Sequence, residues 1–375
     1  MAAVRHEPVD RLPQMLWIEP HTILKMAEEV VRARRPADFL FFKALAAARD
    51  AMPNEELRNL VPMAAYLGQS EYLMQLGSDV IGLAWAGSPF FLKKVRIRDG
   101  SAIVTDLYGV ERGIRGLYVE ILKVPCSTPE DLAAYRFPDL SRRVFYDGIR
   151  AFRRAHPGVA ISAETPGVQD VSQWFMGLEN LYLWMALHPD KIKSFFKRLL
   201  EHSLDIIRGS VKAGADMVTI LDDYGAQGRL LISKAMWEEF TYPCLKRQCE
   251  EAHRLGAAVM LHSCGYVEPL LDRIVEAGVD VLQSFQPAAG NDFERAKSEF
   301  GGKLCFATGI DSQTLPAMTP EEVRESVLAG VHTGAPGGGY ILATNHALQV
   351  DTPAENLKML FRTLKEIRRN KYRDN

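Results

Sequence analysis

From about residue 158 onwards, short apolar runs alternate with longer amphipathic segments along the chain. Short apolar runs bounded by turn residues are typical of buried strands, whereas apolar residues at every third or fourth position are typical of helices. The runs predict six strands: Val159–Glu164, Met217–Asp222, Ala258–His262, Val279–Phe285, Leu304–Thr308 and Tyr340–Ala343. The amphipathic segments predict helices that include Asp190–Ala213, Ser233–Leu255, Pro269–Ala277, Pro320–His332 and Pro353–Arg369.

Turn and capping residues support these boundaries. The segments Thr319–Glu322 and Thr352–Glu355 each have Thr in the N-cap position, Pro in the first helical position and Glu in the third. These residues satisfy or tolerate the free N–H groups of a first helical turn. Gly214, Gly256 and Gly278 each stand just before a predicted strand, where a helix commonly ends on glycine.

The first part of the chain offers two further strands, Gln14–Ile18 and Asp79–Ala86. Eight strands with intervening helices predict a single α/β domain over residues 1–375, a (β/α)8 TIM barrel. The alternative is an open, doubly wound sheet, which usually has a glycine-rich turn after its first strand. The glycine-rich segment of this chain, Gly334–Gly339, comes late and precedes a strand, so the closed barrel is favoured.

The segment from about residue 90 to 157 interrupts this alternation. Lys94–Arg98 and Ala102–Asp106 read as the two strands of a hairpin that turns at Asp99-Gly100. We therefore expect an inserted hairpin or rim region there.

Composition and charge narrow the function. The formal net charge is −2, so no bulk basic field points to nucleic acid or to an anionic membrane. No run of 18 apolar residues predicts a spanning helix, and the N-terminus lacks the apolar core of a signal peptide. Five dispersed cysteines argue against a disulfide framework and for a reducing cytoplasm.

The stretch His262-Ser263-Cys264-Gly265 follows a predicted strand and carries the clearest candidate chemistry. On a continuing strand the histidine and the cysteine point to the same side. A thiol and an imidazole at one strand end suit zinc, although two ligands are too few. The alternative is a core histidine beside an inert buried thiol.

Further polar residues stand at the predicted strand ends, which form the active face of such a barrel. Glu164 is a candidate for proton transfer, or else the partner of an arginine. Asp222 and Asp223 point to opposite sides, so one faces the barrel mouth and the other caps a turn. His346 is either a metal ligand or a polar cap. The remaining polar residues at strand ends are Gln283, Gln286, Asp311 and Asn345.

Four stretches resemble the uroporphyrinogen decarboxylase superfamily, and in particular its branch of corrinoid-dependent methyltransferases. They are Pro8–Pro13, Asp222–Gly225, Leu261–Gly265, and Gly338–Ala343 running into Asp351–Asn356. The resemblance extends over nearly the whole chain and implies a (β/α)8 barrel with its site at the C-terminal ends of the strands.

The resemblance also implies a zinc site. The methyltransferases of this branch bind zinc through a His-x-Cys pair and a later cysteine. His262 and Cys264 match the pair, and His346 stands near the position of the later cysteine. The chain contains no Asp-x-His-x-x-Gly stretch of the corrinoid-binding type, so cobalamin is expected on a partner protein. The small-molecule partner would be a methyl donor, such as a methyl ether, or a thiol acceptor.

Two other functions remain open from the sequence. One is a metal-free decarboxylase of a carboxylated, tetrapyrrole-like substrate, in which Asp222 or Asp223 holds a cationic intermediate. The decarboxylases carry an arginine motif near the first strand, whereas Gln14–Pro20 contains no arginine. The other is a binding module for a tetrapyrrole or a corrinoid protein without turnover.

Overall fold

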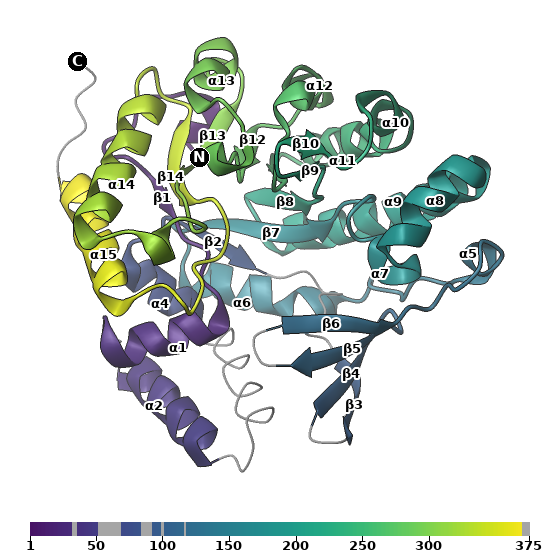
Figure 1. The fold of residues 1–375 in the computed structure, drawn as a ribbon, viewed down its shortest axis with the longest axis horizontal. Helices are drawn as coiled ribbons and strands as arrows, with labels where there is room; N and C mark the ends of the chain where they lie inside the picture. The colour runs from purple at the N-terminus through teal and green to yellow at the C-terminus, as the bar shows by residue number, and fades with distance from the viewer. Residues whose placement is uncertain (32–35, 52–68, 84–91, 99–100, 116–117, 370–375) are drawn as a thin grey trace. The chain divides into compact units, whose positions relative to one another are not determined.

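The computed structural model describes residues 1–31, 36–51, 69–83, 92–98, 101–115 and 118–369 (Figure 1). Eight strands form a closed barrel in the order β1–β14–β13–β12–β11–β8–β7–β2. The predicted (β/α)8 barrel is therefore confirmed. Its strands are β1 (Gln14–Met15), β2 (Val80–Leu83), β7 (Ala160–Pro166), β8 (Met217–Leu221), β11 (Ala258–His262), β12 (Val281–Gln283), β13 (Cys305–Ile310) and β14 (Tyr340–Thr344).

The chain divides into two compact units, of which the first comprises residues 1–81 and 281–375. Within it β14 pairs in parallel with both β1 and β13, and α14 and α15 pack against each other (Figure 1). The predicted cap at Thr319 is confirmed as a capping box with Glu322. The helices of this unit are α1 (Pro20–Glu29), α2 (Pro36–Ala51), α4 (Gln69–Leu76), α13 (Phe293–Phe300), α14 (Pro320–Gly334) and α15 (Ala354–Arg369), with 3-10 turns at Ala3–Arg5, Pro287–Ala289 and Leu315–Ala317.

The prediction of a second cap at Thr352 is wrong. The hydroxyl of Thr352 is buried and has no hydrogen-bond partner among the described residues. The main-chain carbonyl of Thr352 instead accepts a hydrogen bond from Lys25 Nζ of α1, at 2.8 Å. This contact between distant segments holds Thr352, and no local sequence pattern signals it.

The second unit comprises residues 82–280. The prediction of one helix over Ser233–Leu255 is wrong, because this segment forms two helices that are separated at Thr241. Pro243 lies in the first turn of the second helix, where the N–H that proline lacks would have no partner. The helices are α5 (Asp131–Ala134), α6 (Asp147–Ala155), α7 (Gln173–Met176), α8 (Leu178–Leu187), α9 (Pro189–Ala213), α10 (Lys234–Phe240), α11 (Tyr242–Arg254) and α12 (Leu271–Ala277), with 3-10 turns at Arg143–Tyr146 and Glu268–Leu270.

The inserted region of this unit contains a four-stranded antiparallel sheet, visible as four arrows in Figure 1. The predicted hairpin forms its first two strands, and the turn at Asp99-Gly100 lies outside the described residues. Two more strands extend the hairpin and were not predicted. The four strands are β3 (Leu92–Arg98), β4 (Ser101–Asp106), β5 (Glu111–Arg115) and β6 (Tyr118–Lys123).

A buried ion pair holds the turn between β4 and β5 of this sheet. The Asp106 carboxylate accepts hydrogen bonds from the backbone N–H groups of Tyr108 and Val110 and from the Arg112 guanidinium. The same guanidinium lies 4.7 Å from the ring centroid of Trp174 in α7. The inserted sheet is therefore joined to the helix that follows β7 through a cation–π contact of the ion-paired arginine.

Two loops of the second unit interlock at their glycines. The loop after β8 forms a small hairpin, β9 (Gly225–Ala226) with β10 (Arg229–Leu230), and the N–H of Tyr266 donates to the carbonyl of Ala226 at 2.9 Å. A Cβ atom on Gly265 would lie 2.3 Å from the Gly225 carbonyl carbon. Gly265 also has φ +80°, which disfavours other residues. The two loops can approach this closely only because both positions lack a side chain.

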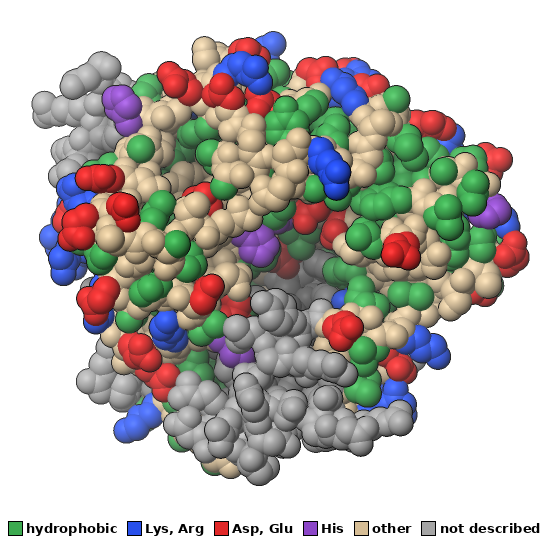
Figure 2. All heavy atoms as spheres, in the orientation of Figure 1, with side chains coloured by type: hydrophobic (Ala, Val, Ile, Leu, Met, Phe, Trp, Pro, Cys, Tyr) green, Lys and Arg blue, Asp and Glu red, His purple; other side chains and the backbone are tan. Residues whose placement is uncertain are grey.

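None of the described helices is both long enough and apolar enough to span a bilayer. On the face drawn in Figure 2, acidic and basic side chains of the described residues are interspersed, in keeping with the formal net charge of −2.

Gly265→Ala should destabilise the protein much more than Gly256→Ala. Both glycines have positive φ, at +80° and +83°, so each substitution incurs backbone strain of about 1–2 kcal/mol. A Cβ on Gly256 meets nothing within 4 Å, whereas one on Gly265 overlaps the Gly225 backbone and adds about 1–3 kcal/mol. Urea unfolding of both variants measures the difference. Equal losses of unfolding free energy would contradict the interlocked loops.

Candidate metal centre

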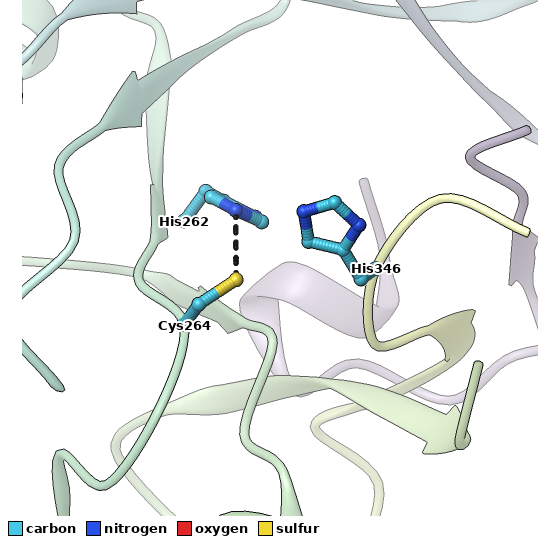
Figure 3. Close-up of side chains that lie close together, drawn as sticks. All are labelled: His262, Cys264 and His346. Atoms are coloured by element: carbon cyan, nitrogen blue, oxygen red, sulfur yellow. Dashed lines mark hydrogen bonds between the residues drawn. The ribbon is translucent and has the colours of Figure 1, made fainter. Parts of the chain in front are cut away.

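His262 and Cys264 come together at the end of β11 in the second unit. His262 is the last residue of the strand and is 5% exposed, while Cys264 lies two residues further and is half-buried. The Sγ atom of Cys264 lies 3.4 Å from Nε2 of His262, the contact drawn as a dashed line in Figure 3. The predicted convergence of the two side chains is therefore present in the structure.

This separation fits two ligands of one tetrahedral zinc ion. Zinc–sulfur and zinc–nitrogen bonds of about 2.3 and 2.0–2.1 Å, at a tetrahedral angle, place the two ligand atoms about 3.5 Å apart. The observed 3.4 Å between Cys264 Sγ and His262 Nε2 matches that value. Cys264 and His262 also supply the soft sulfur and the imidazole that zinc prefers.

Asp223 orients the loop that carries the thiol. Its Oδ1 atom accepts a hydrogen bond from the backbone N–H of Cys264 at 2.6 Å and lies 3.9 Å from Nε2 of His262. The Asp223 side chain is about one third exposed, so this carboxylate also meets solvent. A carboxylate in this position fixes the backbone of Cys264, and the hydrogen bond involves the backbone N–H rather than the thiol.

Asp222 holds a backbone turn, a role that differs from that of its neighbour Asp223. Its carboxylate accepts hydrogen bonds from the backbone N–H groups of Val168 and Asp170, in the turn after β7. A Cβ on Gly167 would lie 2.2 Å from the Cβ of Asp222, so the turn passes directly over this carboxylate. Asp222 therefore caps the turn, whereas Asp223 faces the histidine and the cysteine.

Glu164 and Asp170 are half-buried residues whose carboxyl groups lie near His262. Burial raises the pKa of Glu164 to about 7, against an opposing effect of the His262 imidazole. Burial, and after it the neighbouring Asp223 and Asp222 carboxylates, raise the pKa of Asp170 to about 8. Glu164 and Asp170 can therefore carry or release a proton near neutral pH.

His346 belongs to the first unit, two residues after β14. Its ring stacks on Trp17, with centroids 4.9 Å apart and an angle of 29° between the planes. The preceding Asn345 anchors the loop, because its Oδ1 accepts from Thr308 Oγ1 at 2.6 Å and its N–H donates to the Ile310 carbonyl at 2.8 Å. The half-buried imidazole is thus held by the anchored residue before it and by its stacking partner.

Among the described residues, His262, Cys264 and His346 form a group in which one ligand atom of each side chain lies within 4.8 Å of the others (Figure 3). Imidazole nitrogen and thiolate sulfur are both donors that zinc takes in proteins. Three protein ligands also match the number at catalytic zinc sites, where a fourth position stays open to water or substrate.

The fold and these side chains can be compared with known proteins. The model of the uroporphyrinogen decarboxylase (URO-D) family matches residues 114–367, which is more than half of the chain. The chain belongs to the URO-D family. Its curated relatives include a uroporphyrinogen decarboxylase of Anaeromyxobacter dehalogenans, 26% identical over 246 residues that cover 62% of this chain and 67% of that enzyme.

The curated relatives of this chain also include a methyltransferase. A methylated-thiol–coenzyme M methyltransferase of Methanosarcina mazei is 26% identical over 203 residues, which cover 53% of this chain and 51% of that protein. A solved methyltransferase structure from Methanosarcina mazei covers 97% of this chain and 96% of its own, with a TM-score of 0.65 and 19% identity. At that identity the structural likeness establishes the fold alone.

Sequence reasoning missed Asp170 in this URO-D family member. It lies beyond the turn after β7, and its proximity to Asp222 and Asp223 follows from the tertiary fold. The Thr165-Pro166-Gly167 turn, which brings the chain back over β8, was the available signal. Tyr182 of α8 also lies near this cluster, since Asp170 contributes to the rise of its pKa to about 12, after burial itself.

Other polar residues predicted at the strand ends support the backbone. Gln283 Nε2 donates to the Thr344 carbonyl at 2.9 Å, and Asp311 accepts from the N–H of Gln313 at 3.0 Å. The proposed alternative for Glu164, a pairing with arginine, has no counterpart in the ion pairs found among the described residues. Its electrostatic neighbour is His262.

The buried carboxyl of Glu164 predicts a pH-dependent stability in the metal-free protein. Because burial favours the protonated form, the stabilisation is fully present below about pH 4 and is lost as the pH rises through about 7. Relative to Glu164→Gln, the wild-type free energy of unfolding should fall by on the order of 2–3 kcal/mol over this interval. Urea unfolding at pH 4.5 and 7.5 measures it.

Glu179→Gln is the matched control, because Glu179 is exposed on α8. Its pH dependence should follow that of the wild type. Parallel pH dependences of the wild type and Glu164→Gln would rule out a buried proton at Glu164.

Proposed function

We propose that this URO-D family member is a zinc-dependent methyltransferase that works with a corrinoid protein in the cytoplasm. It would take a methyl group from an oxygen donor, such as a methyl ether, or pass one to a thiol acceptor. The observation that carries the proposal is the His–Cys–His donor set of His262, Cys264 and His346. The methyltransferase among the curated relatives supports the reaction class.

In this proposal His262, Cys264 and His346 would hold the zinc, and the substrate would bind beside them. Bound there, zinc would supply Lewis acidity to the atom that carries the methyl group. Asp223 would keep the Cys264 backbone in place through its 2.6 Å hydrogen bond. Such outer partners of metal ligands commonly affect metal affinity and activity by about 10–100-fold.

Glu164, Asp222 and Asp223 are the proposed acid, base and orienting groups of the site. Glu164 would move a proton to or from substrate, because burial raises its pKa to about 7. Asp222 would keep the turn after β7 closed over the site, through the N–H groups of Val168 and Asp170. The barrel would bind the small molecule, and the cobalamin would come on the partner protein.

His346 stands where the resembling methyltransferases have a cysteine ligand, and this difference favours a substrate that donates its methyl group from oxygen. A neutral imidazole in place of a thiolate makes the ligand set less negative by one charge. A less negative set leaves a stronger Lewis acid, which suits polarisation of an ether or hydroxyl oxygen better than the handling of a nucleophilic thiolate.

Decarboxylation of a carboxylated substrate is the second candidate, favoured by the uroporphyrinogen decarboxylases among the relatives. The site as described disfavours it, since Glu164, Asp170, Asp222 and Asp223 would repel a polycarboxylate whenever they are ionised and offer it no positive charge. Arg11, which precedes β1, pairs with Asp79. Purified decarboxylase would carry no zinc, whereas the leading proposal requires about one zinc per chain.

The double variant His262→Ala/Cys264→Ala should lose its zinc and stay folded. Both side chains lie at or beyond a strand end, so their removal takes little from the barrel core. Zinc per chain, measured by elemental analysis, should fall from about one to near zero, with an unchanged circular dichroism spectrum. His332→Ala/Cys244→Ala removes the same residue types from α14 and α11 and should keep the metal. Unchanged zinc in the first variant would end the zinc proposal.

His346→Cys should shift the reaction towards thiols. The thiolate makes the site more negative, so methylation of a thiol from methylcobalamin should rise and demethylation of a methyl ether should fall. The ratio of the two rates should change by about ten-fold or more. His332→Cys, on the exposed side of α14, should leave the ratio unchanged. A ratio that stays constant in His346→Cys would mean that His346 does not tune the metal.

A further inference from the structure

Glu19 and His21 form a carboxylate–imidazole pair just after β1. One carboxylate oxygen of Glu19, Oε2, accepts the N–H of Thr22 at 3.0 Å and so caps α1. The other oxygen, Oε1, lies 2.5 Å from Nδ1 of His21. Burial raises the pKa of Glu19, but the hydrogen bonds from His21 and Thr22 outweigh that effect and leave it below its ordinary value. The ionised carboxylate therefore holds the proton of Nδ1, and Nε2 is the nitrogen available for exchange.

The exchangeable nitrogen of His21 is buried without a partner. Nε2 has no hydrogen-bond partner among the described residues, although the side chain is only 10% exposed. Buried polar atoms in native proteins are almost always paired, so an unpaired one calls for a ligand or another explanation. His202 offers the contrast: its Nε2 meets the Tyr108 hydroxyl at 3.0 Å and its ring stacks on Phe137. His202 is a satisfied core histidine, and His21 is not.

The surroundings of His21 belong to the loop that carries His346. Lys25 lies one helical turn after His21 on the same face of α1, and its Nζ donates to the carbonyls of Val350 and Thr352 at 2.8 Å. The loop after β1 is also bonded to this segment, because the N–H of Glu19 donates to the Leu348 carbonyl at 3.1 Å. The residues on either side of His21 along the chain, Glu19 and Lys25, therefore both bond to the loop after β14.

Both loops follow the C-terminal ends of barrel strands, where barrels of this type bind substrate. The same two loops hold the stacked rings of Trp17 and His346. The buried Nε2 of His21, on the segment that follows the first of these loops and without a partner among the described residues, is suited to the polar atom of a bound substrate.

We propose that His21 is a catalytic residue that donates a proton from Nε2 to the substrate oxygen as that oxygen loses its methyl group. This inference rests on the proposed function and deepens it, because it assigns the donor to the class of aryl or alkyl methyl ethers. The bond between oxygen and the methyl carbon breaks, and its electron pair stays on the oxygen. The oxygen takes the Nε2 proton and leaves as an alcohol or phenol, and His21 becomes neutral. The methyl carbon receives its new electron pair from the reduced corrinoid of the partner.

The pairing with Glu19 suits this role. The carboxylate fixes the orientation of the ring and stabilises the imidazolium that precedes proton transfer. Glu19 is itself fixed as the cap of α1, so the pair is built on a helix terminus rather than on a free loop end.

The first experiment measures phenol binding to the zinc-free protein by calorimetry. Phenol is the product expected from the simplest aryl methyl ether, and it needs no metal or corrinoid for this test. His21→Leu removes the hydrogen-bonding nitrogen and should weaken phenol binding by about ten-fold. Binding of toluene, which lacks the oxygen, should not change, and His332→Leu should bind both molecules as the wild type does. Equal phenol affinities in wild type and His21→Leu would overturn the proposal.

The second experiment measures kcat/KM of the zinc- and corrinoid-supplied enzyme for substituted anisoles. His21→Gln keeps a hydrogen-bonding side chain but cannot act as an acid. It should slow anisole, whose phenolate is a poor leaving group, by about 100-fold or more, and 4-nitroanisole far less. A uniform loss across the series would indicate a structural role for His21 and overturn the assignment. A wild type that binds phenol through His21 and transfers no methyl group would instead contradict the proposed function.

Discussion

The candidate centre depends on the contact between the Gly225 and Gly265 backbones. This contact brings the loop after β8 against the loop after β11, at a distance that no side chain at either position would allow. Because the loops are in register, the Asp223 carboxylate reaches the N–H of Cys264, and the Ser263 hydroxyl accepts the N–H of Tyr224 at 2.9 Å. The positions of the thiol and of the nearest acidic group thus follow from a main-chain constraint rather than from side-chain packing.

The buried carboxyl groups give the second unit an electrostatic preference. Glu164, Asp170 and Asp222 have raised pKa values chiefly because burial disfavours their charged forms. Asp223 contributes a further acidic side chain, with about one third of its surface exposed. A low-dielectric site with this many acidic groups is stabilised by a cation and destabilised by an anionic substrate. The same groups that suit a metal ion therefore disfavour a polycarboxylate.

Features encoded over short stretches of sequence could be predicted, and features that depend on distant contacts could not. The strands β7, β8, β11, β13 and β14 follow from apolar runs, and the His262–Gly265 stretch follows from residue types at a strand end. Each of these features depends on residues close together in the sequence, so it can be predicted without knowledge of the fold.

Distant contacts decide the features that the sequence did not reveal. Asp170 joins the site because the turn after β7 folds over Asp222, and Thr352 fails to cap α15 while its carbonyl is held by Lys25. A single domain over residues 1–375 stays a prediction, and the chain divides into two compact units.

The stacking of His346 on Trp17 has a consequence for metal selectivity. A side chain that is already immobilised loses little conformational entropy when it becomes a ligand, which saves on the order of 1 kcal/mol relative to a free rotamer. The same immobility resists rearrangement. A metal that required the imidazole in another orientation would first have to separate the two rings. Ring stacking would therefore act as a geometric filter, in favour of ions that accept the arrangement already present.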